Sequence, residues 1–170
     1  MDWHDPDVRK MFVLGGLVIS LTACGALGDI DRSKRYKVNS PSMEPTIAEG
    51  SVVTAKVVKP GDYQPRVGDI VVFDPPDSYG WNPDGAPRIS RVVAVAGDTV
   101  ACCDAQGRIF RNGTVQDEPY VKEPAFSTAF EHLTVPAGKL YLLGDLRGAA
   151  NDSSHNGPVA AGNVIGIIKR

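Results

Sequence analysis

The sequence predicts a mainly β protein, an antiparallel domain that follows an apolar N-terminal anchor or signal helix. Three observations support this prediction. The 18 glycines and 13 prolines are spread along the chain, as in proteins whose short strands are joined by turns. Several runs rich in β-branched residues are bounded by such turns. No amphipathic helix longer than two turns is evident.

Length and charge narrow the function classes. The 170 residues suffice for one domain plus an appendage. The formal net charge is −2 and no basic stripe is visible, so we expect no nucleic-acid partner. No C-x-x-C pair and no histidine cluster suggests a metal site, and we expect no cofactor.

The N-terminal segment is predicted to lie in or at a membrane. Residues 11–28 carry no charge and follow Arg9 and Lys10, the layout of a signal peptide or a short membrane-spanning helix. The stretch Leu21–Cys24 resembles the lipobox of bacterial lipoproteins, so an uncleaved anchor and a lipidated Cys24 remain alternatives. We therefore divide the chain into a cytoplasmic N-terminus (1–10), the anchor or signal segment (11–28), a charged linker (29–37) and an extracytoplasmic β domain (38–170).

Six stretches after the linker have strand character. The pair Asn112–Gly113 separates two short runs and is the strongest hairpin signal in the chain. Proline and glycine predict a long loop over 74–87, and 117–138 is expected to be rich in coil. The stretches predicted to form strands are 51–58, 68–74, 88–104 (two strands that meet at Gly97–Asp98), 108–116 (the hairpin), 139–145 and 164–170.

Cys102 and Cys103 are adjacent, so they cannot join two separate elements through an ordinary disulfide. A vicinal disulfide and two free, half-buried thiols are the alternatives. We favour the thiols.

A serine between two prolines is the first candidate for chemistry. Ser42 stands between Pro41 and Pro45 in the stretch NSPSMEPTIAEGS, and these rings restrain the backbone on both sides. If the segment is extended, the hydroxyl of Ser40 lies on the same side as that of Ser42. A restrained nucleophile beside a hydrogen-bond donor is what acyl transfer needs, whereas a turn with solvated serines is the plain alternative.

The stretch PSMEPTIAEGS closely resembles the nucleophile motif of type I signal peptidases, serine peptidases of family S26. Four further stretches resemble the remaining family motifs and follow in family order, and DEPYV is typical of the Gram-positive members. Together they cover nearly all of the chain from residue 38 onward. They are VGDIVVFDPP (67–76), SRVVAVAGDTV (90–100), DEPYV (117–121), and VPAGKLYLLGDLR with NDSSHNGPV (135–159).

This resemblance implies a membrane-tethered, antiparallel β domain, folded as a partial barrel, which removes signal peptides with small residues at positions −1 and −3 from exported pre-proteins. Ser42 would be the nucleophile. The hydroxyl of Ser40 and the N–H of Ser42 would hold the oxyanion, and Met43 would keep the site apolar. Signal peptides and the membrane are the implied partners.

The general base of the family is missing. In the family a buried lysine immediately precedes the arginine that matches Arg91, but here that position is Ser90. A serine hydroxyl cannot accept the proton. His155, in the last motif, is a candidate substitute because an imidazole titrates near pH 6.5; an exposed loop histidine is the alternative interpretation.

The last motif also lacks two of the polar residues found in the family. Ala150 stands where the family serine supports the lysine, and Leu146 replaces an asparagine. Asp145, Arg147 and Asp152 are retained, and we expect Asp145 and Arg147 to form a structural ion pair near the site. The alternatives to an active endopeptidase are an impaired relative that binds signal peptides or regulates an active paralogue, and a surface lipoprotein that reuses the fold.

Overall fold

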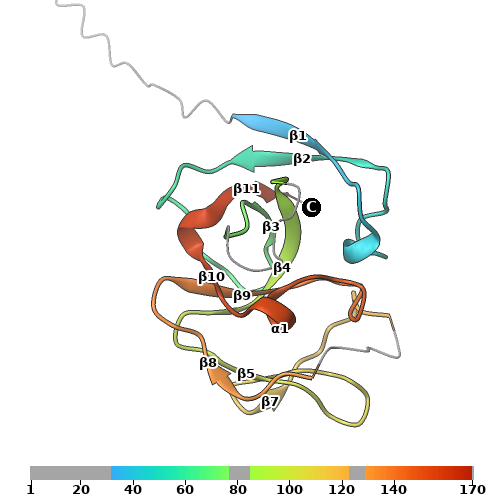
Figure 1. The fold of residues 1–170 in the computed structure, drawn as a ribbon, viewed down its shortest axis with the longest axis vertical. Coiled ribbons are helices and arrows are strands. Elements are labelled where there is room, and N and C mark those ends of the chain that lie inside the picture. The colour runs from blue at the N-terminus through green and yellow to red at the C-terminus, as the bar shows by residue number, and fades with distance from the viewer. Residues whose placement is uncertain (1–31, 77–84, 123–128, 170) are drawn as a thin grey trace, which may run out of the picture. The chain divides into compact units, whose positions relative to one another are not determined.

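The computed structural model describes residues 32–76, 85–122 and 129–169. Two antiparallel sheets account for its regular structure (Figure 1). The larger sheet has seven strands in the order β1-β2-β11-β3-β4-β9-β10, and the smaller has four in the order β7-β6-β5-β8. The prediction of a mainly β, antiparallel domain is confirmed.

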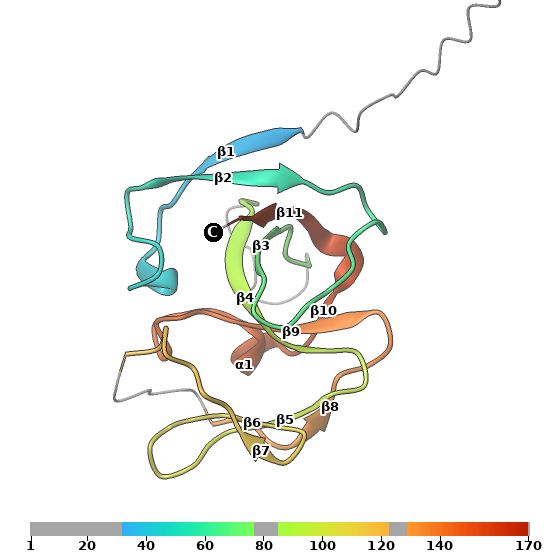
Figure 2. The same cartoon turned by 180° about the vertical axis from the view of Figure 1, so that it is seen from behind.

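The larger sheet curls so that β1 and β2 lie at one end of the ribbon and β9 and β10 near its middle (Figures 1 and 2). Its strands are β1 (Ser33–Lys37), β2 (Val52–Val57), β3 (Ile70–Phe73), β4 (Arg88–Val95), β9 (Lys139–Leu143), β10 (Val159–Ala160) and β11 (Val164–Ile168).

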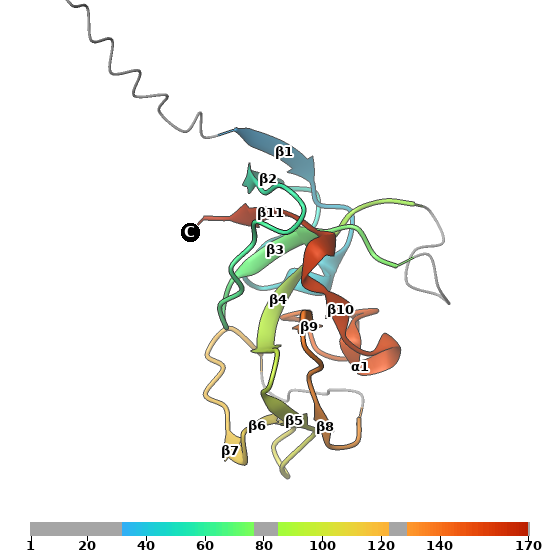
Figure 3. The ribbon, with the colours of Figure 1, turned by 90° about the vertical axis from the view of Figure 1, so that its left-hand side faces the viewer.

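The smaller sheet lies at the far end from β1 and β2 in all three views (Figure 3). Asn112 and Gly113 form its tight turn with φ angles of 52° and 75°, the positive values that a two-residue hairpin of this type requires. The hairpin predicted there is confirmed. The strands are β5 (Thr99–Ala101), β6 (Phe110–Arg111), β7 (Thr114–Val115) and β8 (Leu133–Thr134).

β1 is a strand that the sequence analysis did not anticipate. It occupies residues assigned to the charged linker and pairs along its whole length with β2, Ser33 opposite Lys56 and Lys37 opposite Val52. Four of its five residues are exposed, so the strand lacks the alternation of apolar and polar residues by which a strand is predicted.

β3 and β4 are the central strands of the larger sheet. All four residues of β3 are buried, which its continuous apolar run, Ile-Val-Val-Phe, predicts for a strand covered on both faces. One face carries a cluster that includes Val71, Phe73, Val92 and Leu142. The other face contributes Ile70 to a cluster with Val38, Met43 and Ile47. This second cluster holds the segment that carries Ser42.

Short helical turns complete the described structure. They are the 3₁₀ turns η1 (Pro41–Met43) and η2 (Ala161–Asn163) and the single-turn helix α1 (Ser153–Asn156).

Candidate active site

Ser42 lies in the middle of η1, with Ser40 as the N-cap of that turn. The hydroxyl oxygen of Ser40 accepts a hydrogen bond from the backbone N–H of Ser42 at 3.3 Å. The segment is therefore a capped turn and not the extended stretch that we considered. Proline at the first position of the turn explains this, because its fixed φ suits a helical start and its missing N–H costs nothing there.

Met43 fixes the turn to the hydrophobic core. Its side chain is 1% exposed and packs with Val38, Ile47 and Ile70. Burial of a methionine side chain contributes about 1.5–3 kcal/mol to the stability of the fold relative to an exposed one. This contact therefore holds the turn against the core.

The chain that follows β9 packs directly against the backbone of Ser42. The N–H of Leu146 donates to the carbonyl of Ser42 at 3.0 Å. A Cβ on Gly144 would lie 2.5 Å from the Cβ of Ala150 and 2.6 Å from the carbonyl oxygen of Ser42. Glycine is therefore required at 144 by close approach, and Gly144, Ala150 and Ser42 form one contact.

Ser90 lies in β4 and is 5% exposed. It pairs across the sheet with Val71. Because Arg91 is opposite Leu143, the register puts Ser90 level with Gly144, next to the contact just described. The position that sequence analysis assigned to the missing base is thus buried and close to the turn.

No base accompanies these hydroxyl groups in the part of the chain that the structure describes. Within residues 32–76, 85–122 and 129–169, the hydroxyl groups of Ser42 and Ser90 make no hydrogen bond. None of the lysines in those ranges is buried.

Arg91 and Asp145 form a buried, bidentate ion pair behind the turn. The arginine Nε donates to Oδ1 of Asp145 at 2.8 Å and Nη2 donates to Oδ2 at 2.6 Å. Their side chains are 2% and 0% exposed. The hydroxyl of Thr46 also donates to Asp145, and the arginine Nη1 donates to the carbonyl of Gly68 at 3.0 Å.

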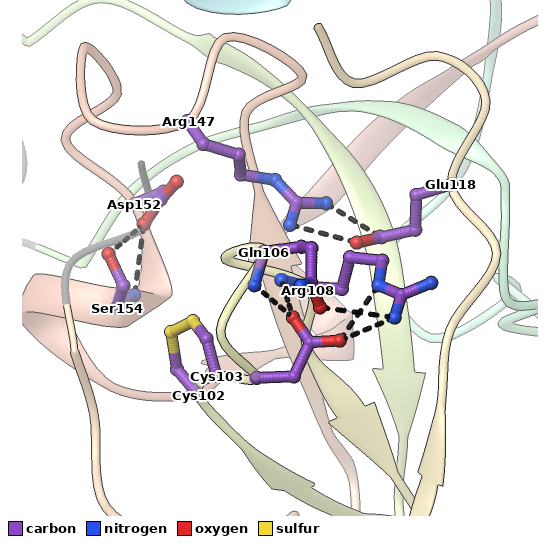
Figure 4. Close-up of a disulfide and its surroundings, with 9 residues drawn as sticks. Cys102, Cys103, Gln106, Arg108, Glu118, Arg147, Asp152 and Ser154 are labelled. Carbon is purple, nitrogen blue, oxygen red and sulfur yellow. Dashed lines mark hydrogen bonds and ion pairs between the residues drawn. A yellow bond between two sulfur atoms is a disulfide. The ribbon is translucent and has the colours of Figure 1, made fainter. Parts of the chain in front are cut away.

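Arg147 pairs with Glu118 in a second buried ion pair, drawn in Figure 4. Its Nη1 and Nη2 lie 2.9 and 2.6 Å from the two carboxylate oxygens, and its Nε donates to the carbonyl of Gly144 at 2.9 Å. The expected ion pair between Asp145 and Arg147 is therefore wrong. Each side chain has a partner from a distant segment, which spacing within the motif does not reveal.

Tyr120 connects the two ion pairs. The guanidinium carbon of Arg91 lies 3.8 Å from the centre of its ring, and its hydroxyl donates to Glu118 at 2.9 Å. Burial raises the pKa of Tyr120 above its usual range, and the nearby Glu118 carboxylate raises it further. The Glu-Pro-Tyr stretch is recognisable in the sequence, but no local pattern indicates these roles for Glu118 and Tyr120.

Asp152 links α1 to the same loop. One carboxylate oxygen accepts from the N–H and hydroxyl of Ser154 at 2.9 and 2.6 Å, as in a helix N-cap. The other accepts from the N–H of Gly144 at 2.9 Å. The neighbouring His155 is exposed, its Nδ1 lies 3.1 Å from the hydroxyl of Ser154, and no hydrogen bond joins it to Ser42.

Cys102 and Cys103 form a disulfide (Figure 4), whereas we favoured two thiols. The N–H of Cys102 donates to the carbonyl of Phe130 at 3.3 Å, and Cys103 packs against the cluster around Ile109 and Tyr141. The sequence alone does not distinguish the two redox forms, because adjacent cysteines at the end of a strand are compatible with either.

A surface depression lies away from the candidate site. A depression of about 380 Å³ is lined by Gly68–Ile70 and Ile167–Lys169 and includes none of the predicted site residues. Within the described ranges, no group of three or more His, Cys, Asp or Glu side chains is arranged to hold a metal ion.

Some predictions fall on residues outside the described ranges. These are the predicted cytoplasmic N-terminus (1–10), the segment 11–28 with Cys24, residues 29–31 of the linker, residues 77–84 of the long loop and residues 123–128 of the coil-rich stretch. Among the residues that the structure describes, no helix combines the length and the apolar character needed to cross a bilayer.

Comparison with known proteins identifies the family. The family model described as "Signal peptidase, peptidase S26" matches residues 12–170. Thylakoidal processing peptidase 1 of Arabidopsis thaliana is 37% identical over 135 residues, which are 76% of this chain and 38% of that protein. A probable signal peptidase I-1 of Synechocystis is 33% identical, with 88% of this chain and 76% of that protein covered.

A shorter relative matches over most of both chains. Signal peptidase I V of Bacillus subtilis is 31% identical over 78% of this chain and 82% of its own length. The chain therefore belongs to the signal peptidase family, peptidase S26, and the predicted family is confirmed. It spans little more than a third of the Arabidopsis relative.

Proposed function

We propose that this protein is a serine endopeptidase of the signal peptidase I type that removes signal peptides from exported pre-proteins. Membership of the peptidase S26 family supports this activity, and the names of its relatives indicate the substrate class. We further propose that residues 11–28 tether it to a membrane with the β domain outside the cytoplasm, either as an anchor helix or through Cys24.

The observation that carries the proposal is the way Ser42 is held. Ser42 lies half-buried on a capped turn that the buried side chain of Met43 holds against the core. The N–H of Leu146 donates to the carbonyl of Ser42. A hydroxyl on such a rigid support is pre-positioned to attack an approaching peptide carbonyl, which lowers the entropic part of the barrier.

In the proposed reaction, the Ser42 oxygen attacks the carbonyl carbon of the scissile bond and forms a tetrahedral oxyanion. The N–H of Ser42 and the hydroxyl of Ser40 would donate to that oxyanion. The N–H is directed at the Ser40 oxygen, so the substrate carbonyl has to replace Ser40 as its acceptor. Loss of one such donor in other hydrolases costs about 2.7–4 kcal/mol.

The proton of Ser42 also needs an acceptor. We propose His155 as the substitute base, and this role requires α1 to approach Ser42 when substrate binds, because no hydrogen bond joins the two residues here. If His155 is the base, His155→Ala removes most of the cleavage activity, and an unchanged cleavage rate in that variant excludes the role.

The lack of a bonded base in the described residues favours a second candidate function, binding of signal peptides without turnover. In that case the buried Arg91–Asp145 and Arg147–Glu118 pairs would maintain a peptide-binding surface in a protein that regulates an active relative.

One assay separates the two candidates. The full chain in detergent is incubated with a pre-protein whose junction reads Ala-x-Ala, and products are identified by mass spectrometry. We expect cleavage at that junction and none with Ser42→Ala. Equal rates for the two proteins overturn the peptidase proposal, and signal-peptide binding without an acyl-enzyme burst supports the second candidate.

A further inference from the structure

The hydroxyl of Thr46 joins the segment that carries Ser42 (residues 41–46, the Ser42 segment) to the buried Arg91–Asp145 pair. A carboxylate only accepts hydrogen bonds, so the hydroxyl donates to Oδ2 of Asp145. Its oxygen accepts from Nη2 of Arg91 at 3.4 Å, the longer of the two contacts. The hydroxyl therefore has a charged partner on each side, and the direction of its proton is fixed.

We propose that Thr46 is a positioning residue for the reaction at Ser42. The inference rests on the peptidase activity proposed above and adds to it a residue that acts through the Ser42 segment. Thr46 fixes the place of the Ser42 hydroxyl relative to β4, the strand that carries Ser90.

Two directional contacts tie the Ser42 segment to the chain that follows β9, and they lie four residues apart. The carbonyl of Ser42 accepts from the N–H of Leu146 at 3.0 Å, and Thr46 donates to the neighbouring Asp145. Burial of Met43 holds the segment against the core, but apolar contact is non-directional. The orientation of the segment therefore depends on both hydrogen bonds, and loss of the Thr46 hydroxyl leaves one.

On its other side, the same hydroxyl is connected to β4 through Arg91. The arginine side chain is 2% exposed, and its Nη1 donates to the carbonyl of Gly68 at 3.0 Å, so its position does not depend on Thr46. Arg91 immediately follows Ser90, the position that matches the missing base of the family. Thr46 therefore connects the segment of the nucleophile to the strand on which the family places its base.

A positioning residue is expected to act on the rate of bond cleavage. Both partners of the Thr46 hydroxyl lie within the protein, so its removal takes away no contact to substrate. A displacement of about 1 Å at a reacting atom lowers an enzymatic rate about 10²-fold. We therefore expect kcat to respond to this hydroxyl, and KM to respond little.

Thr46→Val is the test variant, because valine has nearly the shape of threonine without the hydroxyl. Asp145 keeps its two bonds from Arg91, so we expect the variant to fold, which circular dichroism verifies. In steady-state cleavage of a substrate with an Ala-x-Ala junction, kcat should fall about 10- to 100-fold while KM stays within about two-fold.

Two further variants at position 46 separate the hydroxyl from the shape of the side chain. Thr46→Ser keeps the hydroxyl and should restore most of kcat. Thr46→Ala also lacks the hydroxyl, and it should lower kcat as valine does. The alanine variant decides the matter if valine is not tolerated.

Tyr63→Phe is the matched control. The hydroxyl of Tyr63 also donates to a carboxylate, that of Asp69, at 2.8 Å. Both residues precede β3 and belong neither to the Ser42 segment nor to the chain after β9. Removal of this hydroxyl should leave kcat and KM within about two-fold of the unaltered protein.

Amide exchange measured by NMR gives a readout that does not need turnover. In Thr46→Val, exchange of the Leu146 N–H should accelerate at least about ten-fold, because the segment that accepts from it has lost its second tie. The N–H of Val135, which donates to the carbonyl of Asp98 at 2.8 Å, should keep its rate. A general loss of stability accelerates both.

An unchanged kcat in Thr46→Val, an effect on KM alone, or no recovery in Thr46→Ser overturns the inference. An unaltered chain that cleaves nothing refutes the peptidase proposal instead, and the exchange measurement then decides the inference by itself. In that case, equal exchange of the Leu146 N–H in Thr46→Val and Thr46→Ser shows that the hydroxyl does not hold the Ser42 segment in place.

Discussion

The two sides of the candidate site differ in how their polar groups are satisfied. Behind Ser42 lie two buried ion pairs in which each guanidinium nitrogen and each carboxylate oxygen has a partner. The pairs are Arg91 with Asp145 and Arg147 with Glu118. On the side where chemistry would occur, the described residues leave the hydroxyl groups of Ser42 and Ser90 without a hydrogen bond.

This difference shows that the support of the site and its proton transfer are separable. The ion pairs position the loop around Gly144 against Ser42 and do not need a base to be present. A buried charge that loses its partner is costly, whereas a missing lysine removes a charge and leaves nothing unpaired. The ion pairs can therefore stabilise the fold whether or not a base is present.

The largest expected effect comes from restoring a base. Ser90→Lys with Ala150→Ser places an amine at a buried position level with Gly144. Burial lowers the pKa of such an amine, which allows it to accept a proton near neutral pH. We expect the cleavage rate of an Ala-x-Ala substrate to rise about 10²- to 10⁴-fold, measured by single-turnover kinetics.

Ser90→Met/Ala150→Ser is the control for that variant, because it fills the site without a base. Circular dichroism verifies that each variant is folded. A folded lysine variant that is no faster than the methionine control shows that Ser90 does not occupy the position of the family base.

The next effect comes from breaking the buried ion pair. Arg91→Ala leaves the Asp145 carboxylate, which is 0% exposed, without its partner. We expect the free energy of unfolding to fall by about 3–5 kcal/mol, measured by urea denaturation. Arg108→Ala removes an arginine from a partly exposed pair with Asp104 and should change little. A loss of similar size in both variants contradicts the importance assigned to burial.

A smaller effect is expected at the contact between the loop and the turn. Gly144→Ala introduces a methyl group 2.6 Å from the Ser42 carbonyl oxygen, so the turn or the loop has to move. We expect a loss of about 1–3 kcal/mol in stability and a larger proportional loss of activity. Gly162→Ala, where a Cβ meets nothing within 4 Å, is the matched control. Tolerance of alanine at both positions refutes the close packing.

The smallest effect concerns alkaline pH. The pKa of Tyr120 is raised, first by burial and then by Glu118, so the folded protein holds the phenolic proton more tightly than the unfolded chain. The resulting stability is fully present below about pH 10, the ordinary value for tyrosine, and is lost as the pH rises through the folded pKa. Burial raises the pKa values of Tyr63 and Tyr141 in the same direction.

Tyr120→Phe should cost about 1 kcal/mol at neutral pH through the lost hydrogen bond. It should also make the decline of stability above pH 10 less steep, although Tyr63 and Tyr141 keep part of that decline. Thermal denaturation between pH 8 and 11 measures both quantities. An unchanged slope contradicts the raised pKa of Tyr120.

Much of the fold could be predicted because its signals are local. The β-branched run of β2, the buried run of β3 and the turn at Asn112–Gly113 each carry their own pattern. β1 could not be predicted in the same way. It pairs with β2 through backbone hydrogen bonds, and its exposed side chains carry no apolar period.

In the candidate site, too, some features have local sequence signals and others do not. Position in a motif is enough to name Ser42, Ser90 and Asp152 as candidates, because each lies within a recognisable stretch. Pairing partners could not be read in this way, since Arg91 is 54 residues from Asp145 and Arg147 is 29 residues from Glu118. Nothing in the local pattern specifies which distant carboxylate an arginine reaches.

The hydrogen bond from the Ser42 N–H to Ser40 occupies the donor that the proposed reaction would direct at the oxyanion. A water molecule or an unsuitable carbonyl finds that donor already engaged. At 3.3 Å the bond is at the long, weak end for an N–H donor, so in the proposed reaction a well-placed substrate carbonyl would displace it at small cost. Selectivity would then begin with competition for a single amide proton, before any side chain of the substrate has been recognised.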